Sequence, residues 1–169
     1  MLARVLARLH RFSEAAAAFL LAVIFVAFIL QIAMRYVFNW PVGWTTELSL
    51  AAWLWLVLWG AAFVLRDEEE IRFDFLVERA SPRVRRVMGI VAALGVIVLF
   101  GMAIPASYSY VAFMKVETSS YLGVRMDWMY SIYLVFAVAV IARNLRQLTR
   151  LLGGEPPAPP DPTATRSAL

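Results

Sequence analysis

Four long apolar runs constrain the fold of this chain more than any other feature. They cover about residues 15–34, 48–65, 87–109 and 127–145. A helix of about 20 residues, rising about 1.5 Å per residue, crosses the roughly 30 Å hydrocarbon core of a bilayer. Hydrophobic residues make up 62% of the chain and charged residues 17%, whereas soluble domains average about 45–50% and about 25%. The sequence therefore predicts an all-α integral membrane protein with four transmembrane helices.

Two of these runs have an alternative interpretation. Arg4, Arg8 and Arg11 precede the first run, as in a secretory signal peptide. The apolar core of a signal peptide has only about 7–15 residues, so we expect the first run to be a retained span. The uninterrupted part of the fourth run, residues 128–142, is short. A re-entrant or interfacial segment is therefore an alternative to a complete crossing there.

The basic residues alternate with the apolar runs. Of 16 Lys and Arg residues, three precede the first run, six lie between the second and third, and four follow the uninterrupted part of the fourth, which ends at residue 142. Cytoplasmic segments beside membrane spans carry such an excess. We therefore expect both termini to be cytoplasmic, with residues 35–47 and 115–127 outside. A nucleic-acid surface would not alternate with membrane spans, so we expect no nucleic-acid partner despite the net charge of +4.

The remaining segments predict how the membrane domain is bounded. Residues 66–86 mix acids and bases around Ile71 and Phe75, which is compatible with a short interfacial helix between spans two and three. Ser81-Pro82 is typical of a helix N-cap and first helical residue. Residues 153–169 hold five of the eight prolines. We expect them to form a disordered cytoplasmic tail behind a membrane domain of residues 1–152.

The stretch RYVFNWPVGWTTEL connects the first two runs. We expect Trp40 and Trp44 at the membrane interface, where an indole buries its ring and keeps its N–H in water. We expect Pro41 and Gly43 to turn the chain. Thr45 or Thr46 is then expected to cap the second helix.

The same stretch contains a cation and a carboxylate, Arg35 and Glu47. Glu47 is expected in the first turn of the second helix, where the helix dipole favours a negative charge. Arg35 and Glu47 are candidates to pair with each other, with lipid headgroups or with a partner protein. We hypothesise that this connection is an outer-surface clasp; an interfacial loop without a specific partner is the alternative.

The uninterrupted apolar parts of the runs contain no Asp, Glu, Lys, Arg or His. Transporters that move charged solutes alone usually need such groups within the membrane. The pair Gly89 and Ala93 favours close helix packing, and Trp55 and Trp59 share a helix face. These features favour an accessory subunit. A self-sufficient four-span exporter and a membrane assembly or scaffold protein are the alternatives.

The chain has no cysteine and a single histidine, His10. Haem, iron–sulfur and zinc sites need several Cys or His ligands. We therefore expect no cofactor and no metal site. We find no cluster of catalytic side chains and do not expect an enzyme.

Four short motifs follow one another in the first half of the chain. They are RYVF at 35–38, Trp44 with Glu47, Gly60-Ala61, and IRFD at 71–74. In this order and spacing they resemble the small membrane subunit of TRAP (tripartite ATP-independent periplasmic) transporters, the DctQ-type component. The sequence departs from the family pattern at Glu70, where a histidine is common, so no role of that histidine is carried over.

The resemblance implies a multi-pass protein of the bacterial inner membrane that works with a large membrane subunit and a periplasmic substrate-binding protein. It implies sodium-driven uptake of an organic acid, such as a C4-dicarboxylate, a keto acid or sialic acid. The small subunit would brace the scaffold of a large elevator-type transport subunit. Our candidates for contact with the partner are Arg35, Trp40, Trp44, Glu47, Trp55, Trp59, Gly60 and Asp74.

Overall fold

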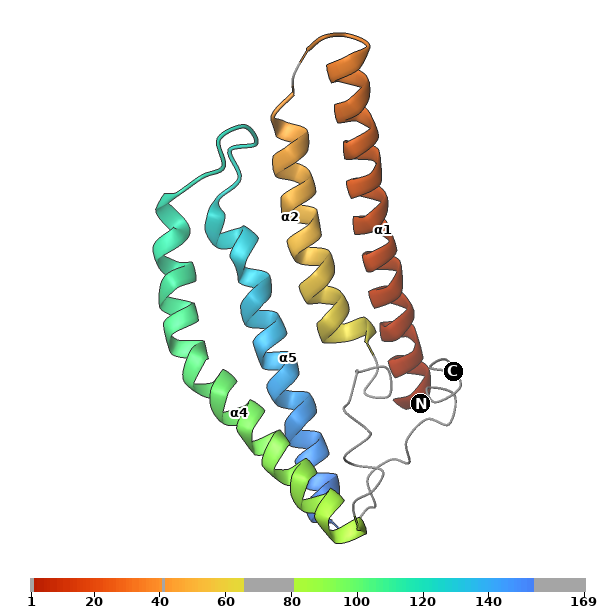
Figure 1. Cartoon of the computed structure of the whole chain (residues 1–169), viewed down its shortest axis with the longest axis vertical. Helices are drawn as coiled ribbons and strands as arrows, with labels where there is room; N and C mark the ends of the chain where they lie inside the picture. The colour runs from red at the N-terminus through yellow and green to blue at the C-terminus, as the bar shows by residue number, and fades with distance from the viewer. Residues whose placement is uncertain (1, 41, 66–80, 154–169) are drawn as a thin grey trace. The chain divides into compact units, whose positions relative to one another are not determined.

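The structure is a computed structural model that describes residues 2–40, 42–65 and 81–153 (Figure 1). Its elements, in chain order, are α1 (Leu2–Tyr36), α2 (Trp44–Trp59), the π-helical turn η1 (Gly60–Val64), α4 (Pro82–Phe113), the 3₁₀ turn η2 (Met114–Val116) and α5 (Met126–Leu152). Within these residues, extended chains pair only at an isolated bridge between Thr118 and Arg125. The all-α prediction is confirmed.

Four described helical segments are long and apolar enough to cross a membrane. They are Arg8–Tyr36, Trp44–Val64, Arg83–Val116 and Met126–Leu152. Each is longer than its predicted run, because polar and charged residues continue the helices beyond the apolar core. The fourth segment is helical over 27 residues, or about 40 Å, which is long enough for a complete crossing.

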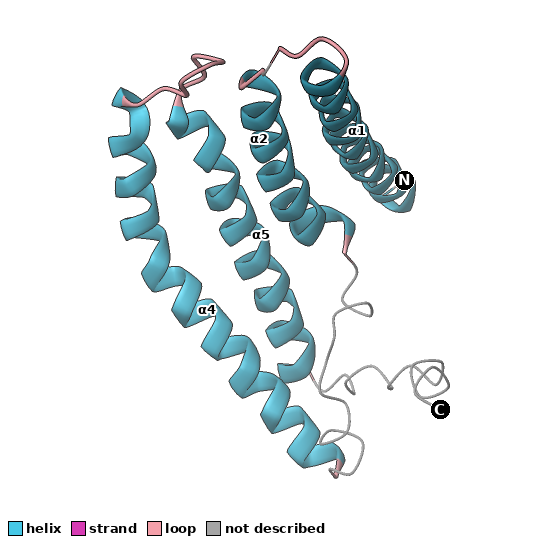
Figure 2. Ribbon diagram, turned by 45° about the horizontal axis from the view of Figure 1, so that its top comes forward, coloured by secondary structure: helices cyan, strands magenta, loops and turns pink. Residues whose placement is uncertain are grey.

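The helices belong to two compact units. The first comprises Met1–Leu65 and Ile104–Val138, and the second comprises Arg66–Ala103 and Ala139–Leu169. α1 and α2 lie entirely in the first unit. The end of α4 and the start of α5 also belong to the first unit, and the start of α4 and the end of α5 belong to the second. The two connections of the first unit lie at the same end of its helices (Figure 2); their described residues are 37–40 with 42–43, and 117–125. We call this the loop end.

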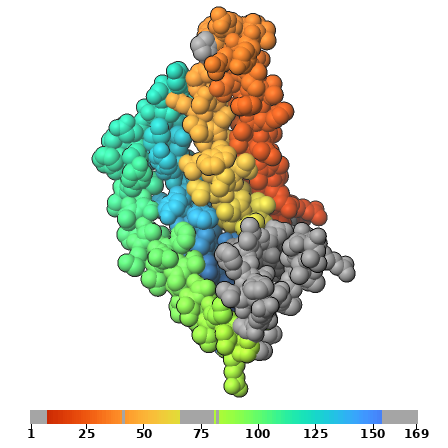
Figure 3. All heavy atoms as spheres, viewed as in Figure 1, coloured from red at the N-terminus to blue at the C-terminus, as the bar shows by residue number. Residues whose placement is uncertain are grey.

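Small side chains and two hydrogen bonds hold α1 against α2 in the first unit. Ala27 and Ala52 are buried, which lets the two backbones approach closely. Near the loop end, Gln31 Nε2 donates to Thr46 Oγ1 at 3.1 Å. Near the other end, Trp59 Nε1 donates to the Ser13 carbonyl at 3.2 Å. The space-filling view shows the atoms of α1 and α2 in contact (Figure 3).

The second unit packs the start of α4 against the end of α5. Ala93 is buried, and a Cβ atom at Gly89 would lie 3.0 Å from Leu151 Cδ1. Arg86 Nη2 donates to the Leu152 carbonyl at 3.0 Å. The prediction that Gly89 and Ala93 serve helix packing is thus confirmed.

The two predicted helix starts have different outcomes. α4 begins at Pro82, and the Ser81 carbonyl accepts the Arg85 N–H at 2.9 Å, as predicted. The prediction that Thr45 or Thr46 caps α2 is wrong, because the helix already begins at Trp44 and has no side-chain cap. Thr45 is instead fully buried and donates from Oγ1 to the Val42 carbonyl at 3.1 Å. A buried hydroxyl needs such an acceptor.

Several predictions lie outside the described residues. The interfacial helix between the second and third spans falls on residues 66–80, which include Glu70 and Asp74. The Pro-rich tail falls on residues 154–169. These remain predictions.

Candidate functional site

Glu47 binds the connection between α4 and α5. Its Oε1 accepts the backbone N–H of Ser120 at 2.9 Å and of Tyr121 at 3.1 Å. Its Oε2 accepts Tyr121 at 3.1 Å and Leu122 at 3.0 Å. Three successive amides thus form a concave site for one carboxylate, an arrangement of charge-assisted hydrogen bonds. Glu47 therefore fastens the α4–α5 connection to the first turn of α2.

The connection that receives Glu47 is closed by its own hydrogen bonds. Ser119 donates its N–H to the Val124 carbonyl at 2.9 Å, and Ser119 Oγ accepts the Val124 N–H at 3.2 Å. Gly123 has φ +64°, a conformation that glycine adopts without steric cost. The Thr118–Arg125 bridge lies just outside this turn. The amides of residues 120–122 are therefore held in position for the carboxylate.

Gly43 brings the two connections of the loop end into contact. A Cβ atom at this position would overlap the ring of Tyr121. The backbone of Gly43 has φ −84° and ψ −28°, a conformation that any residue adopts. Gly43 lies at a bend directly before α2, where the chain was expected to turn, and the other residue expected to turn it, Pro41, lies outside the described residues. Since the backbone angles suit any residue, a glycine at position 43 is explained by the space that the Tyr121 ring occupies.

Arg35 does not pair with Glu47. In the part of the chain that the structure describes, the Glu47 carboxylate is occupied by residues 120–122, and no ion pair joins it to Arg35. Arg35 Cζ instead lies 5.8 Å from the centroid of the Tyr36 ring, within the range of a cation–π contact. The Arg35 side chain is exposed, so it is accessible to a headgroup or a partner.

The predicted tryptophan candidates occupy different surroundings. Trp40 is 70% exposed on the connection between α1 and α2, and Trp44 is 38% exposed at the start of α2. Trp55 is half-buried. Trp59 is engaged within the chain, through its bond to Ser13 and a ring contact with Phe63 at 4.7 Å between centroids.

Gly60 begins a π-helical turn. The Leu65 N–H donates to the Gly60 carbonyl at 2.9 Å, five residues apart, instead of the four residues of an α-helix. Single π-helical turns occur frequently at functional sites. A Cβ atom at Gly60 would meet nothing within 4 Å. This surface of the first unit is therefore open to close approach by another backbone.

An ion pair at the start of α5 was not among the sequence candidates. Arg125 Nε lies 3.1 Å from Asp127 Oδ1, and Arg125 Nη2 lies 2.5 Å from Oδ2. The hydrogen bond to Asp127 raises the pKa of the Arg125 guanidinium above its ordinary value. The two opposite charges just before a short apolar run were the available signal in the sequence.

Comparison with known proteins finds relatives of this chain by sequence. The C4-dicarboxylate TRAP transporter small permease protein DctQ of Pseudomonas aeruginosa is 31% identical over 114 residues, 64% of this chain and 54% of that protein. The protein of the same name from Vibrio cholerae is 30% identical over 103 residues, 56% of this chain and 44% of that protein. The chain thus spans about half the length of these two relatives.

A third relative is similar over a longer stretch. The sialic acid TRAP transporter small permease protein SiaQ of Vibrio cholerae is 24% identical over 136 residues, 79% of this chain and 77% of that protein. The family model described as "Tripartite ATP-independent periplasmic transporters, DctQ component" matches residues 24–154. This match includes all of α2, α4 and α5 and the Glu47 site. The chain therefore belongs to the DctQ-component family of tripartite ATP-independent periplasmic transporters.

Proposed function

We propose that the chain is the small membrane subunit of an organic acid uptake system that depends on a periplasmic binding protein and a sodium gradient. The family match over residues 24–154 is the observation that carries this proposal. The relatives' names support a C4-dicarboxylate or sialic acid as the solute; a keto acid is the further candidate. The apolar character of the four spans supports a partner that holds the solute and ion sites.

The chain braces the scaffold of a large, elevator-type membrane subunit in the bacterial inner membrane. The Glu47 hydrogen bonds support this role, because they join α2 to the α4–α5 connection and so stiffen the loop end. The alternation of basic residues supports cytoplasmic termini. The loop end then faces the periplasm, where the binding protein approaches.

The partner-facing residues are those that the chain itself leaves accessible. Arg35 and Trp40 are exposed at the loop end. Gly60 offers open space on the π-helical turn. Close packing of a partner helix at Gly60 is favoured, since a glycine lets two backbones approach. Glu47 and Trp59 contribute indirectly. Glu47 fixes the connections at the loop end, and Trp59 holds α2 against α1 beside Gly60.

Deletion of the chain in a bacterium that carries the complete system tests this function. Uptake of radiolabelled C4-dicarboxylate, keto acid and sialic acid is measured with and without sodium, before and after the chain is restored. We expect uptake of one of the solutes to be lost and then recovered, and a large membrane protein to co-purify with the tagged chain. Unchanged uptake of all three would contradict the proposal, and an assembly role without transport would then be favoured.

A further inference from the structure

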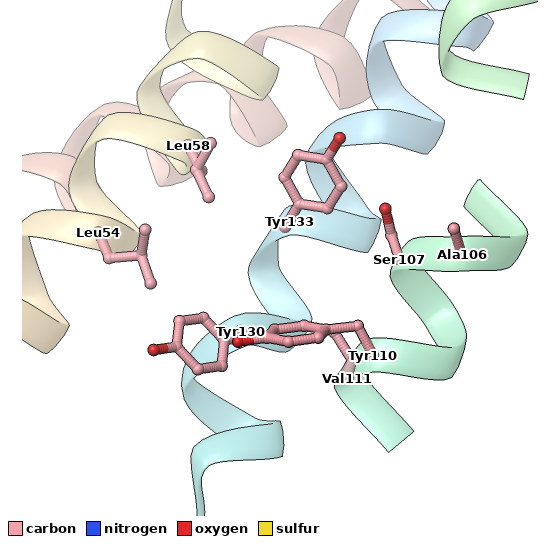
Figure 4. A pocket seen from close by; sticks show the side chains of 8 residues that line it. All are labelled: Leu54, Leu58, Ala106, Ser107, Tyr110, Val111, Tyr130 and Tyr133. Carbon is pink, nitrogen blue, oxygen red and sulfur yellow. The ribbon is translucent and has the colours of Figure 1, made fainter. Parts of the chain in front are cut away.

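The two units differ in the chemistry of the surface that they leave open. The first unit has an apolar groove between α2, α4 and α5 (Figure 4), and all of its lining residues, which include Leu54 and Tyr133, are uncharged. In the second unit, apolar and positively charged side chains are exposed on the same two helices. A surface of this mixed kind restricts what binds to it far more than an apolar groove does.

The charged residues that the structure describes in the second unit are all arginines. Residues 81–103 and 139–153 contain six arginines and no Asp, Glu or Lys. They are Arg83, Arg85 and Arg86 on α4 and Arg143, Arg146 and Arg150 on α5. The ion pairs found among the described residues, His10 with Glu14 and Arg125 with Asp127, lie elsewhere. The described part of this unit therefore suits an anionic ligand.

Two of these arginines continue an apolar face of α5. Val138, Ala142, Arg146 and Arg150 follow one another at intervals of four residues, so they lie along one side of the helix. All four are exposed, Val138 by 58%. An arginine at the edge of an apolar surface extends its charged group toward the headgroups. The face is thus apolar over its first two residues and cationic over the last two, like the two parts of a phospholipid.

The neighbouring stretch of α4 is apolar at the level of these arginines. A Cβ atom at Gly89 would lie 3.0 Å from Leu151 Cδ1, and the two helices run antiparallel (Figure 1). Five residues further along each helix, about 7.5 Å, Arg146 is level with Leu94. Leu94 is 44% exposed and needs hydrocarbon around it. A phospholipid supplies hydrocarbon and charge at this level, whereas an acidic peptide would lose hydration there.

Arg86 adds a third cation beside the end of α5. Its Nη2 donates to the Leu152 carbonyl at 3.0 Å, two residues beyond Arg150. This carbonyl belongs to the last turn of α5, where the helix itself provides no donor. The Arg86 guanidinium keeps its charge and its other N–H groups. The ends of α4 and α5 therefore contribute positive charge together.

We propose that the joined ends of α4 and α5 bind an anionic phospholipid of the cytoplasmic leaflet. The guanidinium groups of Arg146 and Arg150 bind its phosphate, since such groups form paired hydrogen bonds with phosphate oxygens. One acyl chain lies along Ala142 and Val138. The inference goes beyond the proposed function and takes from it only the cytoplasmic placement of this end.

Native mass spectrometry of the full chain tests this proposal. The chain is purified in detergent, stripped of lipid and titrated with palmitoyl-oleoyl-phosphatidylglycerol or with palmitoyl-oleoyl-phosphatidylcholine, which has no net charge. We expect phosphatidylglycerol to bind saturably and about tenfold or more tightly, because two arginines meet its uncompensated negative charge. Equal affinity for the two lipids would overturn the proposal.

Two double variants separate this site from the net charge of the chain. Arg146→Gln with Arg150→Gln should weaken the binding of phosphatidylglycerol about tenfold or more. Arg8→Gln with Arg11→Gln removes the same charge from exposed positions of α1 and should bind like the unmodified chain. Equal weakening in both variants would overturn the site, because the attraction would then follow net charge alone.

A photo-crosslinking amino acid at Ala142 identifies the occupant in native membranes and leaves every arginine in place. A crosslink to an anionic phospholipid supports the proposal. Crosslinks only to zwitterionic lipid, to another polypeptide, or to the acidic residues 67–70 of this chain, which lie outside the described residues, overturn it. Neither measurement needs transport or a large subunit, so failure here and failure of the proposed function are distinguishable.

Discussion

The Oε1 atom of Glu47 lies 2.9 Å from the backbone nitrogen of Ser120, across 73 residues of chain. This bond and its neighbours to Tyr121 and Leu122 join two connections that would otherwise be separate loops. In an isolated loop the N–H groups of residues 120–122 would donate to water or to a partner; here they donate to the Glu47 carboxylate. The loop end is thereby a single surface before any partner binds.

Glu47→Gln should release the α4–α5 connection. The amide group keeps one acceptor oxygen, loses the negative charge and turns an N–H₂ toward backbone donors. We expect hydrogen exchange at the amides of residues 120–122 to become about tenfold faster or more, while the helices keep their protection. Hydrogen exchange with mass spectrometry measures this. Glu117→Gln, an acid of the same connection that does not accept these amides, is the matched control. Equal exchange in both variants would exclude the proposed fastening role.

Gly43→Ala should displace the ring of Tyr121. The added methyl group overlaps this ring, and overpacking costs about 1–3 kcal/mol where neighbours cannot yield. Because Tyr121 can swing outward, we expect about 1 kcal/mol or less, seen as a lower thermal midpoint in detergent. Tyr121→Ala combined with Gly43→Ala should recover the loss.

Gly95→Ala is the control for this substitution, since its Cβ would meet nothing within 4 Å. Alanine is the better helix former by about 1 kcal/mol, so the midpoint should stay or rise. A lower midpoint for Gly95→Ala than for Gly43→Ala would show that the Tyr121 contact is not the cause.

Trp59→Phe should loosen α1 from α2. It removes the indole N–H that donates to the Ser13 carbonyl at 3.2 Å and keeps an aromatic ring beside Phe63. We expect a loss of about 0.5–1.5 kcal/mol in the free energy of unfolding, measured by denaturation in mixed micelles. Trp53→Phe changes an exposed ring of the same helix and should stay within about 0.5 kcal/mol. If both variants unfold alike, the bond to Ser13 contributes nothing measurable.

Gly60→Leu should block assembly while leaving the isolated chain intact. The new side chain enters open space in this chain but would separate a partner helix from the π-helical turn. We expect the thermal midpoint of the chain to be unchanged and capture of the large subunit to fall about fivefold or more. Gly101→Leu adds the same bulk on α4 at another open position and should not affect capture. Full capture by the Gly60→Leu variant would remove Gly60 from the interface.

The existence of the helices followed from the sequence, whereas the contacts between them did not. Apolar runs long enough for a bilayer require helices, because lipid offers no partner for backbone groups. The helices extend several residues beyond the predicted apolar runs, since polar and charged residues continue a helix without adding to an apolar run. The cap of α2 was mispredicted for another reason: Thr45 and Thr46 are typical cap residues, but both lie inside the first turn.

The Glu47 site had no local signature in the sequence. Its donors are backbone amides, and any residue carries one, so no residue type marks Ser120, Tyr121 or Leu122 as partners. The visible charges suggested a pair between Arg35 and Glu47 instead. The space beside Gly43 likewise depends on Tyr121, which lies far away in the sequence.

Uptake into proteoliposomes tests the central claim most directly. Vesicles contain this chain, the large subunit, or both, and receive the binding protein, labelled organic acid and an inward sodium gradient. The account predicts accumulation only when both membrane proteins are present. Accumulation by this chain alone, or undiminished accumulation by the large subunit alone, would contradict it.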